Sequence, residues 1–218
     1  MSIDRKFRLA RIWSNNELRK IAPLFSGNVL NVSAGENIDK EGKTYDQYFT
    51  GASSFSISNF NPGGFRGYQG KENEILIDLE KDLPQELHNK YDVVFNHTTL
   101  EHVFNVFKAF ENLCSLSSDI VIIVVPFAQV QHECPNGYND YWRFTPTCLR
   151  ELFNQNGLEV TYEAANNDFN AATYILMVGS KKADSWVNKM PEFKKLQEVA
   201  NWIGSKEKVN FLTKLFQR

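Results

Sequence analysis

The chain has 218 residues, and its 24 lysines and arginines nearly balance its 26 aspartates and glutamates, which gives a formal net charge of −2. This balance excludes the strongly basic composition that is typical of nucleic-acid-binding proteins, so we expect no nucleic-acid partner. The aromatic content of 13 % excludes a disordered chain, and the length is ample for one α/β domain with appendages.

The cysteines and the apolar runs indicate the cellular compartment of the protein. Three scattered cysteines, Cys114, Cys134 and Cys148, form no CxxC pair, which favours a reducing compartment. The first ten residues lack the apolar core of a signal peptide. The longest apolar run, residues 120–128, is much shorter than the roughly 20 residues that span a bilayer. We therefore expect a cytoplasmic protein without a transmembrane segment.

Residues 1–26 are expected to form a basic flank followed by a short helix. In the first thirteen residues, basic and apolar side chains alternate and Asp4 is the only acid. Such an edge could meet phosphate, an acidic partner or a membrane surface, although a solvated flank packed on the core is more common. The residues from Ser14 can cap a helix that runs through Ile21 and ends before Gly27.

The α/β domain is expected to span residues 27–180 and to begin with a buried strand, Val29 to Val32. A loop of small residues, 33–37, follows this strand directly. A strand that runs into such a loop can bring a nucleotide-type ligand close to backbone N–H groups. A strand followed by a turn without any ligand is equally consistent with the pattern. The second and third strands are predicted at residues 54–58 and 75–79, because both runs are apolar or alternate in polarity.

The central part of the chain predicts a strand–helix–strand unit, and hence a parallel sheet. Residues 92–95 are almost wholly apolar, and Thr98 or Thr99 can cap the helix that follows. Apolar residues then recur at helical spacing, at Val103, Val106, Phe107, Phe110 and Leu113. Residues 120–125 are all β-branched, which predicts a central strand that Pro126 ends. Ligands bind beyond the carboxyl ends of such strands, where polar and aromatic residues gather here.

The last third of the chain predicts a helix, two strands and a helical appendage. Thr145 and Pro146 begin the helix and Gly157 ends it. Strands are expected at residues 158–162 and 173–178. Residues 181–218 are expected to form an appendage with helices at 186–199 and 209–216, whose apolar residues should dock on the domain or form a homodimer.

Two motifs resemble those of class I S-adenosylmethionine-dependent methyltransferases. The segments Leu100–Val103 (LEHV) and Asp140–Thr145 (DYWRFT) match a group of small methyltransferase-like proteins, and the similarity covers roughly residues 27–180. The resemblance implies a Rossmann-like sheet of about seven mostly parallel strands with helices on both faces. It also implies S-adenosylmethionine as the cofactor.

The resemblance implies a cofactor site in which several family residues are replaced. The family's acid after the first strand falls on Asn31, and its three glycines fall on Ser33, Gly35 and Asn37. The acid that grips the ribose falls on Ser58 or Asn59. Such neutral hydrogen bonds are weaker than charged ones, so weaker cofactor binding is expected. The adenine side and the floor of the implied site comprise Asp78, Leu79, Asn96 and His97.

The acceptor side is expected in the loop that follows the central strand. His132 is the candidate general base, and Asp140 could orient it or act itself. A surface histidine is an equal alternative for His132. His132 and Cys134 have poor spacing for zinc, and we predict no metal. The candidate acceptor-binding residues are Glu101, Tyr138, Tyr141, Trp142 and Arg143, although core packing would also explain Trp142.

Three functions remain open from the sequence. The first is methyl transfer from S-adenosylmethionine to a small-molecule acceptor, with glycan biosynthesis as an analogy from the family. The second is a catalytically silent binding or scaffold module on the same fold. The third is a nucleotide-binding enzyme of another class.

Overall fold

The computed structural model describes residues 8–64, 66–134, 137–166 and 173–196. Its core is one seven-stranded sheet with the strand order β3-β2-β1-β4-β5-β7-β6. The strands from β3 to β5 pair in parallel, whereas β7 is antiparallel to both β5 and β6. The prediction of about seven mostly parallel strands is confirmed. The strands are β1 Ser26–Val32, β2 Gly51–Asn59, β3 Glu74–Leu76, β4 Tyr91–His97, β5 Ser117–Ala128, β6 Glu159–Ala165 and β7 Thr173–Ser180.

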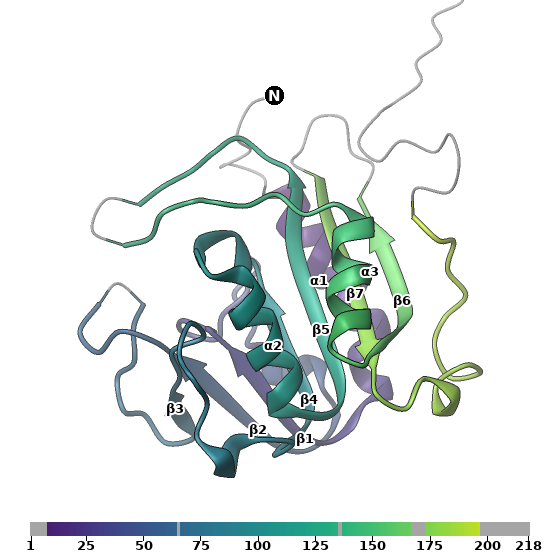
Figure 1. The fold of residues 1–218 in the computed structure, drawn as a ribbon, viewed down its shortest axis with the longest axis horizontal. Coiled ribbons are helices and arrows are strands. Elements are labelled where there is room, and N and C mark those ends of the chain that lie inside the picture. Colours follow the sequence, from purple (N-terminus) through teal and green to yellow (C-terminus); the bar gives the residue numbers. More distant parts are fainter. Residues whose placement is uncertain (1–7, 65, 135–136, 167–172, 197–218) are drawn as a thin grey trace, which may run out of the picture.

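Helices cover both faces of the sheet (Figure 1). On one face lie α2 (Val106–Leu116) and α3 (Pro146–Gln155), and on the other lies α1 (Leu9–Ile21). Alternate residues of β5 supply the two cores: Val121, Ile123 and Val125 pack with α2 and α3, whereas Ile120 and its alternate neighbours pack with α1. Burial on both faces explains why this strand is an unbroken β-branched run.

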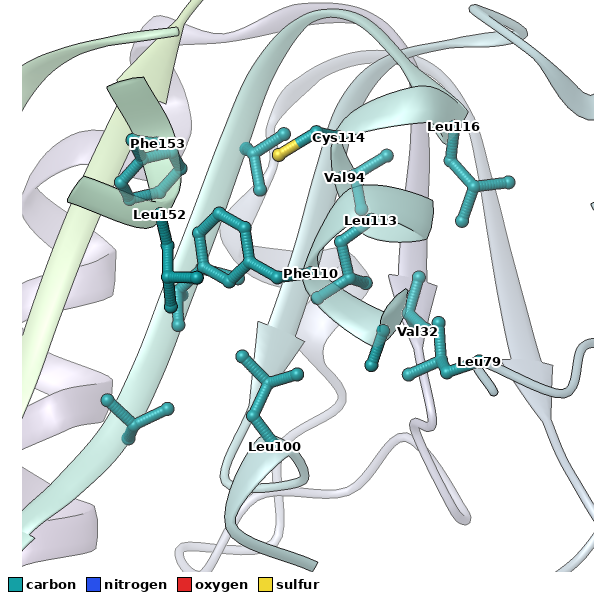
Figure 2. Close-up of a cluster of buried hydrophobic side chains, with 14 of the residues drawn as sticks. Val32, Leu79, Val94, Leu100, Phe110, Leu113, Cys114, Leu116, Leu152 and Phe153 are labelled. Atoms are coloured by element: carbon teal, nitrogen blue, oxygen red, sulfur yellow. The ribbon is translucent and has the colours of Figure 1, made fainter. Parts of the chain in front are cut away.

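The core between the sheet and α2 shows how the helix is held (Figure 2). Phe110 and Leu113 of α2 are fully buried, and the ring of Phe110 lies 4.9 Å from that of Phe153 on α3. Thr145 caps α3 by accepting a hydrogen bond from the Cys148 N–H at 3.1 Å. The predicted start of α3, with Pro146 in its first turn, is confirmed.

The central strand differs from its prediction in place and length. β5 is the fifth strand in the order, beside the middle strand β4, and it runs past Pro126 to Ala128. The pairing with β4 ends at Val124, so the missing N–H of Pro126 interrupts no bond to that strand. Pro126 still pairs with Tyr174 of β7, and the register shifts just after it.

The helix expected from Thr98 or Thr99 begins later. Thr98 has a left-handed backbone with φ +51°, and a 3₁₀ turn, Leu100–His102, precedes α2. α2 starts at Val106, and its buried face comprises residues 106, 109, 110, 112, 113, 114 and 116. Phe107 falls outside this face and is 65 % exposed, so its assignment to the apolar face was wrong.

The first helix and the third strand also have different bounds from those predicted. α1 begins at Leu9, five residues before Ser14. The helix was predicted too short because its buried face carries polar side chains, which interrupt the apolar pattern expected of a buried helix face. β3 ends at Leu76, where its partner β2 ends at Asn59. Residues 77–79 therefore lie beyond the strand.

The predicted helix at 186–199 is not found over its described part. A 3₁₀ turn, Ala183–Ser185, is followed by turns at residues 186–189 and by mostly irregular chain up to Leu196, and Pro191 is incompatible with a helix interior. The segment packs on the domain through Trp186, whose ring lies 5.1 Å from that of Phe25. The second predicted helix, 209–216, and the homodimer expected from it lie outside the described residues. Among the described helices, none is long and apolar enough to cross a membrane.

Candidate functional site

A cavity of about 440 Å³ opens at the carboxyl ends of the parallel strands. The loops that follow β1, β2, β3 and β4 line it, together with Arg11 of α1 and residues 137–139. This is the position at which open parallel sheets bind ligands, and the volume falls within the usual range for small-molecule sites. The predicted site residues that line the cavity are Asn31, Ser33, Gly35, Asn59, Asp78, Leu79, His97 and Tyr138.

The loop after β1 adopts the path of a glycine-rich loop with only one glycine. Ser33, Gly35 and Asn37 have φ values of +56°, +59° and +60°. These are the three positions that the resemblance assigns to glycine. Asparagine tolerates this conformation, whereas for Ser33 it costs on the order of 1 kcal/mol.

Asn59 at the end of β2 holds this loop. Its Oδ1 accepts a hydrogen bond from the Gly35 N–H at 2.7 Å, and its Nδ2 donates to the Gly35 carbonyl at 2.9 Å. Nδ2 also donates to Glu74 at 2.7 Å. Burial alone would raise the pKa of Glu74, but the hydrogen bonds from Asn59 and the neighbouring backbone lower it. Ser58 lies behind the cavity wall, with its Oγ 3.4 Å from the Ser33 N–H.

Two hydrogen-bonded amide side chains connect Asn31, where the resemblance implies an acid, to Asp46. The buried Asn31 Nδ2 donates to Asn37 Oδ1 at 2.8 Å, and Asn37 Nδ2 donates to the Asp46 carboxylate at 3.0 Å. The negative charge therefore sits on Asp46, two side chains away from the end of β1. Asn96, the expected floor residue, is buried and donates to the Val32 carbonyl at 3.0 Å without lining the cavity.

His97 is held as a neutral imidazole at the end of β4. The Arg11 guanidinium donates to its Nδ1 at 2.5 Å, which assigns the proton to Nε2 and lets that atom donate to Ser14 Oγ at 2.9 Å. Ser14 in turn donates to the Arg11 carbonyl. Burial and the charge of Arg11 lower the pKa of His97 well below its usual value. The polar inner face of α1 thus fixes one cavity residue in a single tautomer.

The predicted pair His132 and Asp140 is brought together. Asp140 accepts from the His132 N–H at 2.7 Å, and its Oδ2 lies 3.2 Å from His132 Nδ1. Arg143 binds the same carboxylate through both terminal nitrogens, at 2.6 and 2.7 Å. Burial would raise the pKa of Asp140, but Arg143 and the His132 N–H lower it. Neither His132 nor Asp140 lines the cavity.

Tyr138 is the one predicted acceptor-binding residue among the cavity-lining residues of the described structure. Trp142 donates to the Val103 carbonyl at 3.0 Å and packs against the core. Arg143 is occupied by Asp140 and by the Gln129 carbonyl at 3.1 Å. Tyr141 is 43 % exposed, and its ring lies 5.3 Å from that of Phe104.

Glu101 links the two segments 100–103 and 140–145 through its backbone. Its carbonyl accepts from the N–H groups of Tyr141 and Trp142, at 2.7 and 3.2 Å. Its carboxyl is buried outside the cavity, and burial raises its pKa to about 8. Among the described residues, its Oε2 has no hydrogen-bond partner.

His102 also lines the cavity. Its Nδ1 donates to the Asn139 carbonyl at 2.6 Å, which leaves Nε2 unprotonated. Burial lowers its pKa to about 4, so it is neutral at pH 7. Its ring lies 4.2 Å from that of Tyr138 and 5.1 Å from that of His132, so it stands between the cavity and the His132–Asp140 pair.

Three basic residues, Arg11, Lys40 and Arg66, also line the cavity, and their role was not predicted. The basic character of the N-terminal flank was the only available signal for one of them. No group of three or more histidine, cysteine or acidic side chains within the described ranges is arranged to hold a metal ion.

Comparison with known proteins identifies the fold. No family model matches the chain, and no curated protein matches its sequence. Among solved structures, an S-adenosylmethionine-dependent methyltransferase from Mesorhizobium loti is similar with a TM-score of 0.53 and 10 % identity, over 76 % of this chain and 96 % of that one. Magnesium protoporphyrin IX methyltransferase from Synechocystis, with bound S-adenosylmethionine, has a TM-score of 0.52 and 13 % identity, over 82 % and 85 % of the two chains.

A third structure carries the product form of the cofactor. It is 1,6-didemethyltoxoflavin-N1-methyltransferase from Burkholderia thailandensis with bound S-adenosylhomocysteine, with a TM-score of 0.50 and 14 % identity, over 78 % of this chain and 80 % of that one. At these identities the likeness concerns the fold. The chain therefore has the Rossmann-like fold of these methyltransferases.

Proposed function

We propose that the protein transfers a methyl group from S-adenosylmethionine to a small-molecule or glycan-type acceptor. The observation that carries the proposal is the left-handed backbone at residues 33, 35 and 37, in a loop that lines the cavity through Ser33 and Gly35. A loop needs this backbone where the main chain itself passes close to a ligand, and here the loop keeps it even at Ser33, where it is strained. Magnesium protoporphyrin IX methyltransferase, which has a similar fold, was solved with bound S-adenosylmethionine.

The residues around the cavity fit the cofactor except at the ribose. The backbone of residues 33–35 would hold the methionine part, and Asp78 and Leu79 would hold the adenine side. The resemblance implies an acid at Ser58 or Asn59; both are neutral, and the Asn59 amide is already bonded to Gly35 and Glu74. The site therefore lacks the charged grip on the ribose hydroxyls. This supports binding that is weaker by about tenfold or more than with a carboxylate.

When bound, the cofactor supplies an activated methyl group on its sulfonium. The protein then has to orient the acceptor and receive its proton. We assign the proton to His102, because it is the histidine with an unprotonated Nε2 that lines the cavity. His132, the predicted base, lies outside the cavity with its Nδ1 3.2 Å from the Asp140 carboxylate, so we assign it to holding its loop. Tyr138, whose ring lies 4.2 Å from that of His102, would position the acceptor.

A catalytically silent binding module is the second candidate. Two observations favour it: both acid positions are neutral, and the side chain of Arg66 lies over Gly35, within 3.5 to 3.9 Å of where a β-carbon would stand. A silent module predicts that the cavity does not hold the cofactor. The two candidates therefore differ in a single binding measurement.

Titration calorimetry with S-adenosylhomocysteine separates them. We expect the natural protein to bind the ligand weakly and Gly35→Ala to abolish binding, since φ at this position is +59° and the backbone faces the cavity. Gly42→Ala is the matched control, because φ there is +85°, nothing lies within 4 Å of the added carbon, and the residue does not line the cavity. No binding to the natural protein at millimolar ligand would refute the methyltransferase proposal.

A further inference from the structure

Three basic side chains from distant parts of the chain meet at the cavity. Arg11 comes from α1, Lys40 from the loop after β1, and Arg66 from the loop between β2 and β3. Arg11 is placed by its bond to His97, and the stem of Arg66 lies over Gly35. Arg11 therefore reaches the cavity beside the end of β4, and Arg66 reaches it beside the loop after β1.

We call the part of the cavity that Arg11, Lys40 and Arg66 line the basic corner. The pKa of Lys40 reflects the positive charges around it. Burial lowers its pKa first, and the charges of Arg66, Arg11 and Arg8 lower it further. No carboxylate contributes in the opposite direction. Within the part of the chain that the structure describes, the Lys40 ammonium also makes no hydrogen bond or ion pair. Like charges held together in this way favour the binding of an anion.

The carboxylates that line the same cavity are engaged elsewhere. Asp39 accepts from Tyr48, from Arg19 at 3.5 Å, and from the N–H groups of residues 41 and 43. Asp78 accepts from the Glu80 N–H at 2.9 Å, and Glu80 accepts from the Asn105 N–H at 2.8 Å. Asp78 and Glu80 lie beyond β3, on the adenine side of the expected cofactor. None of them forms a salt bridge with Arg11 or Lys40 among the described residues.

We infer that Arg11, Lys40 and Arg66 form a subsite for a phosphate group, so that the acceptor is a phosphorylated small molecule. This rests on the proposed function, because it names the class of acceptor for the same cavity. The carboxylate of S-adenosylmethionine is the other anion that could reach the basic corner. However, the cofactor also carries an ammonium and a sulfonium, so it adds net positive charge. A phosphate or diphosphate adds two or more negative charges and offers several oxygens to the two guanidinium groups.

Titration with inorganic pyrophosphate at low ionic strength tests the subsite. We expect the natural protein to bind it, and Lys40→Gln and Arg66→Gln each to weaken the binding by about tenfold, since each removes a charged contact. Lys43→Gln is the matched control: it lies in the same loop as Lys40, is exposed and does not line the cavity. Equal thermal unfolding midpoints without ligand would show that the variants are folded. No binding, or equal binding by all four proteins, would overturn the inference.

A second titration separates the sources of the anion and the two proposals. If saturating pyrophosphate leaves the affinity for S-adenosylhomocysteine unchanged, the subsite belongs to the acceptor, as we infer. If the two ligands compete, the basic corner receives the cofactor carboxylate and the phosphate assignment is wrong. Binding of S-adenosylhomocysteine without pyrophosphate binding would refute this inference and leave the proposed function intact. The reverse result would refute the proposed function and retain an anion site.

Discussion

Asn59 binds the peptide groups of Gly35 in both directions, accepting from its N–H at 2.7 Å and donating to its carbonyl at 2.9 Å. A carboxylate could accept from the N–H but could not donate to the carbonyl. The same side chain also donates to Glu74, which is itself a carboxylate. The structure around Asn59 therefore requires an amide at this position, which is one of the two at which the resemblance implies an acid.

Asn59→Asp should lower the free energy of unfolding by about 2–4 kcal/mol at pH 7. The change places two carboxylates in contact and leaves the Gly35 carbonyl without its donor. Urea denaturation measures the effect.

The double variant Asn59→Asp with Glu74→Gln should recover part of this loss. The amide introduced at position 74 would donate to the new carboxylate through its nitrogen, while its oxygen could still accept from the N–H groups of residues 69 and 71. If the loss of unfolding free energy in the double variant equals the sum of the losses in the two single variants, the two side chains do not interact as described.

Ser33→Gly should stabilise the protein by about 0.5–1 kcal/mol, because glycine adopts φ +56° without strain. Thermal unfolding measures the change. Ser33→Ala is the control: it removes the hydroxyl and keeps the strain, so no gain is expected. A gain of equal size in the alanine variant would attribute the effect to the hydroxyl.

Glu101→Gln should stabilise the protein at high pH. Burial raises the pKa of Glu101 in the folded state to about 8, against about 4.3 in the unfolded chain. The folded state thus binds more protons between these values, so the natural protein loses stability as the pH rises through this range.

The gap in unfolding free energy between Glu101→Gln and the natural protein should therefore be small near pH 5. It should widen by at most about 1.4 kcal/mol per pH unit toward pH 8. Urea denaturation at the two pH values tests this, with the exposed Glu86→Gln as the control. A gap that does not change with pH would mean that the Glu101 carboxyl is ionised in the folded state.

Asp140→Asn should weaken the loop that carries His132. The buried carboxylate accepts two bonds from Arg143 and one from the His132 N–H, and an amide can accept with one oxygen only. We expect a loss of about 2–3 kcal/mol and faster hydrogen exchange at the His132 amide. In the Asp140→Asn, Arg143→Gln double variant the loss should be smaller than the sum. Additive losses would show that the two side chains are not coupled.

The sequence predicts the features that are determined by residues close together in the chain. The β-branched run 120–125 and the Thr145–Pro146 helix start are encoded within a few positions, and both were found. The first helix was predicted too short, because its buried face carries Ser14, Asn15 and Glu17. These side chains are polar since they bond to partners far along the chain, such as His97 and Tyr162.

The candidate site was predictable only in part for the same reason. Its strand-end residues follow from the order of strands, so most of the expected cofactor residues line the cavity. The cluster of Arg11, Lys40 and Arg66 joins three segments that only the folded chain brings together. Conversely, Arg143 and Trp142 are residue types that often bind ligands. Here, however, Arg143 donates to Asp140 and Trp142 donates to the Val103 carbonyl, so their hydrogen-bond donors are engaged within the protein.

A crystal structure of the protein with S-adenosylhomocysteine would show whether this cavity holds the methyl donor. We expect the methionine part of the ligand to lie along the backbone of residues 33–35 and its adenine to lie beside Asp78 and Leu79. Ligand density at any other place, or none at saturating concentration, would contradict the proposal that this cavity holds the methyl donor.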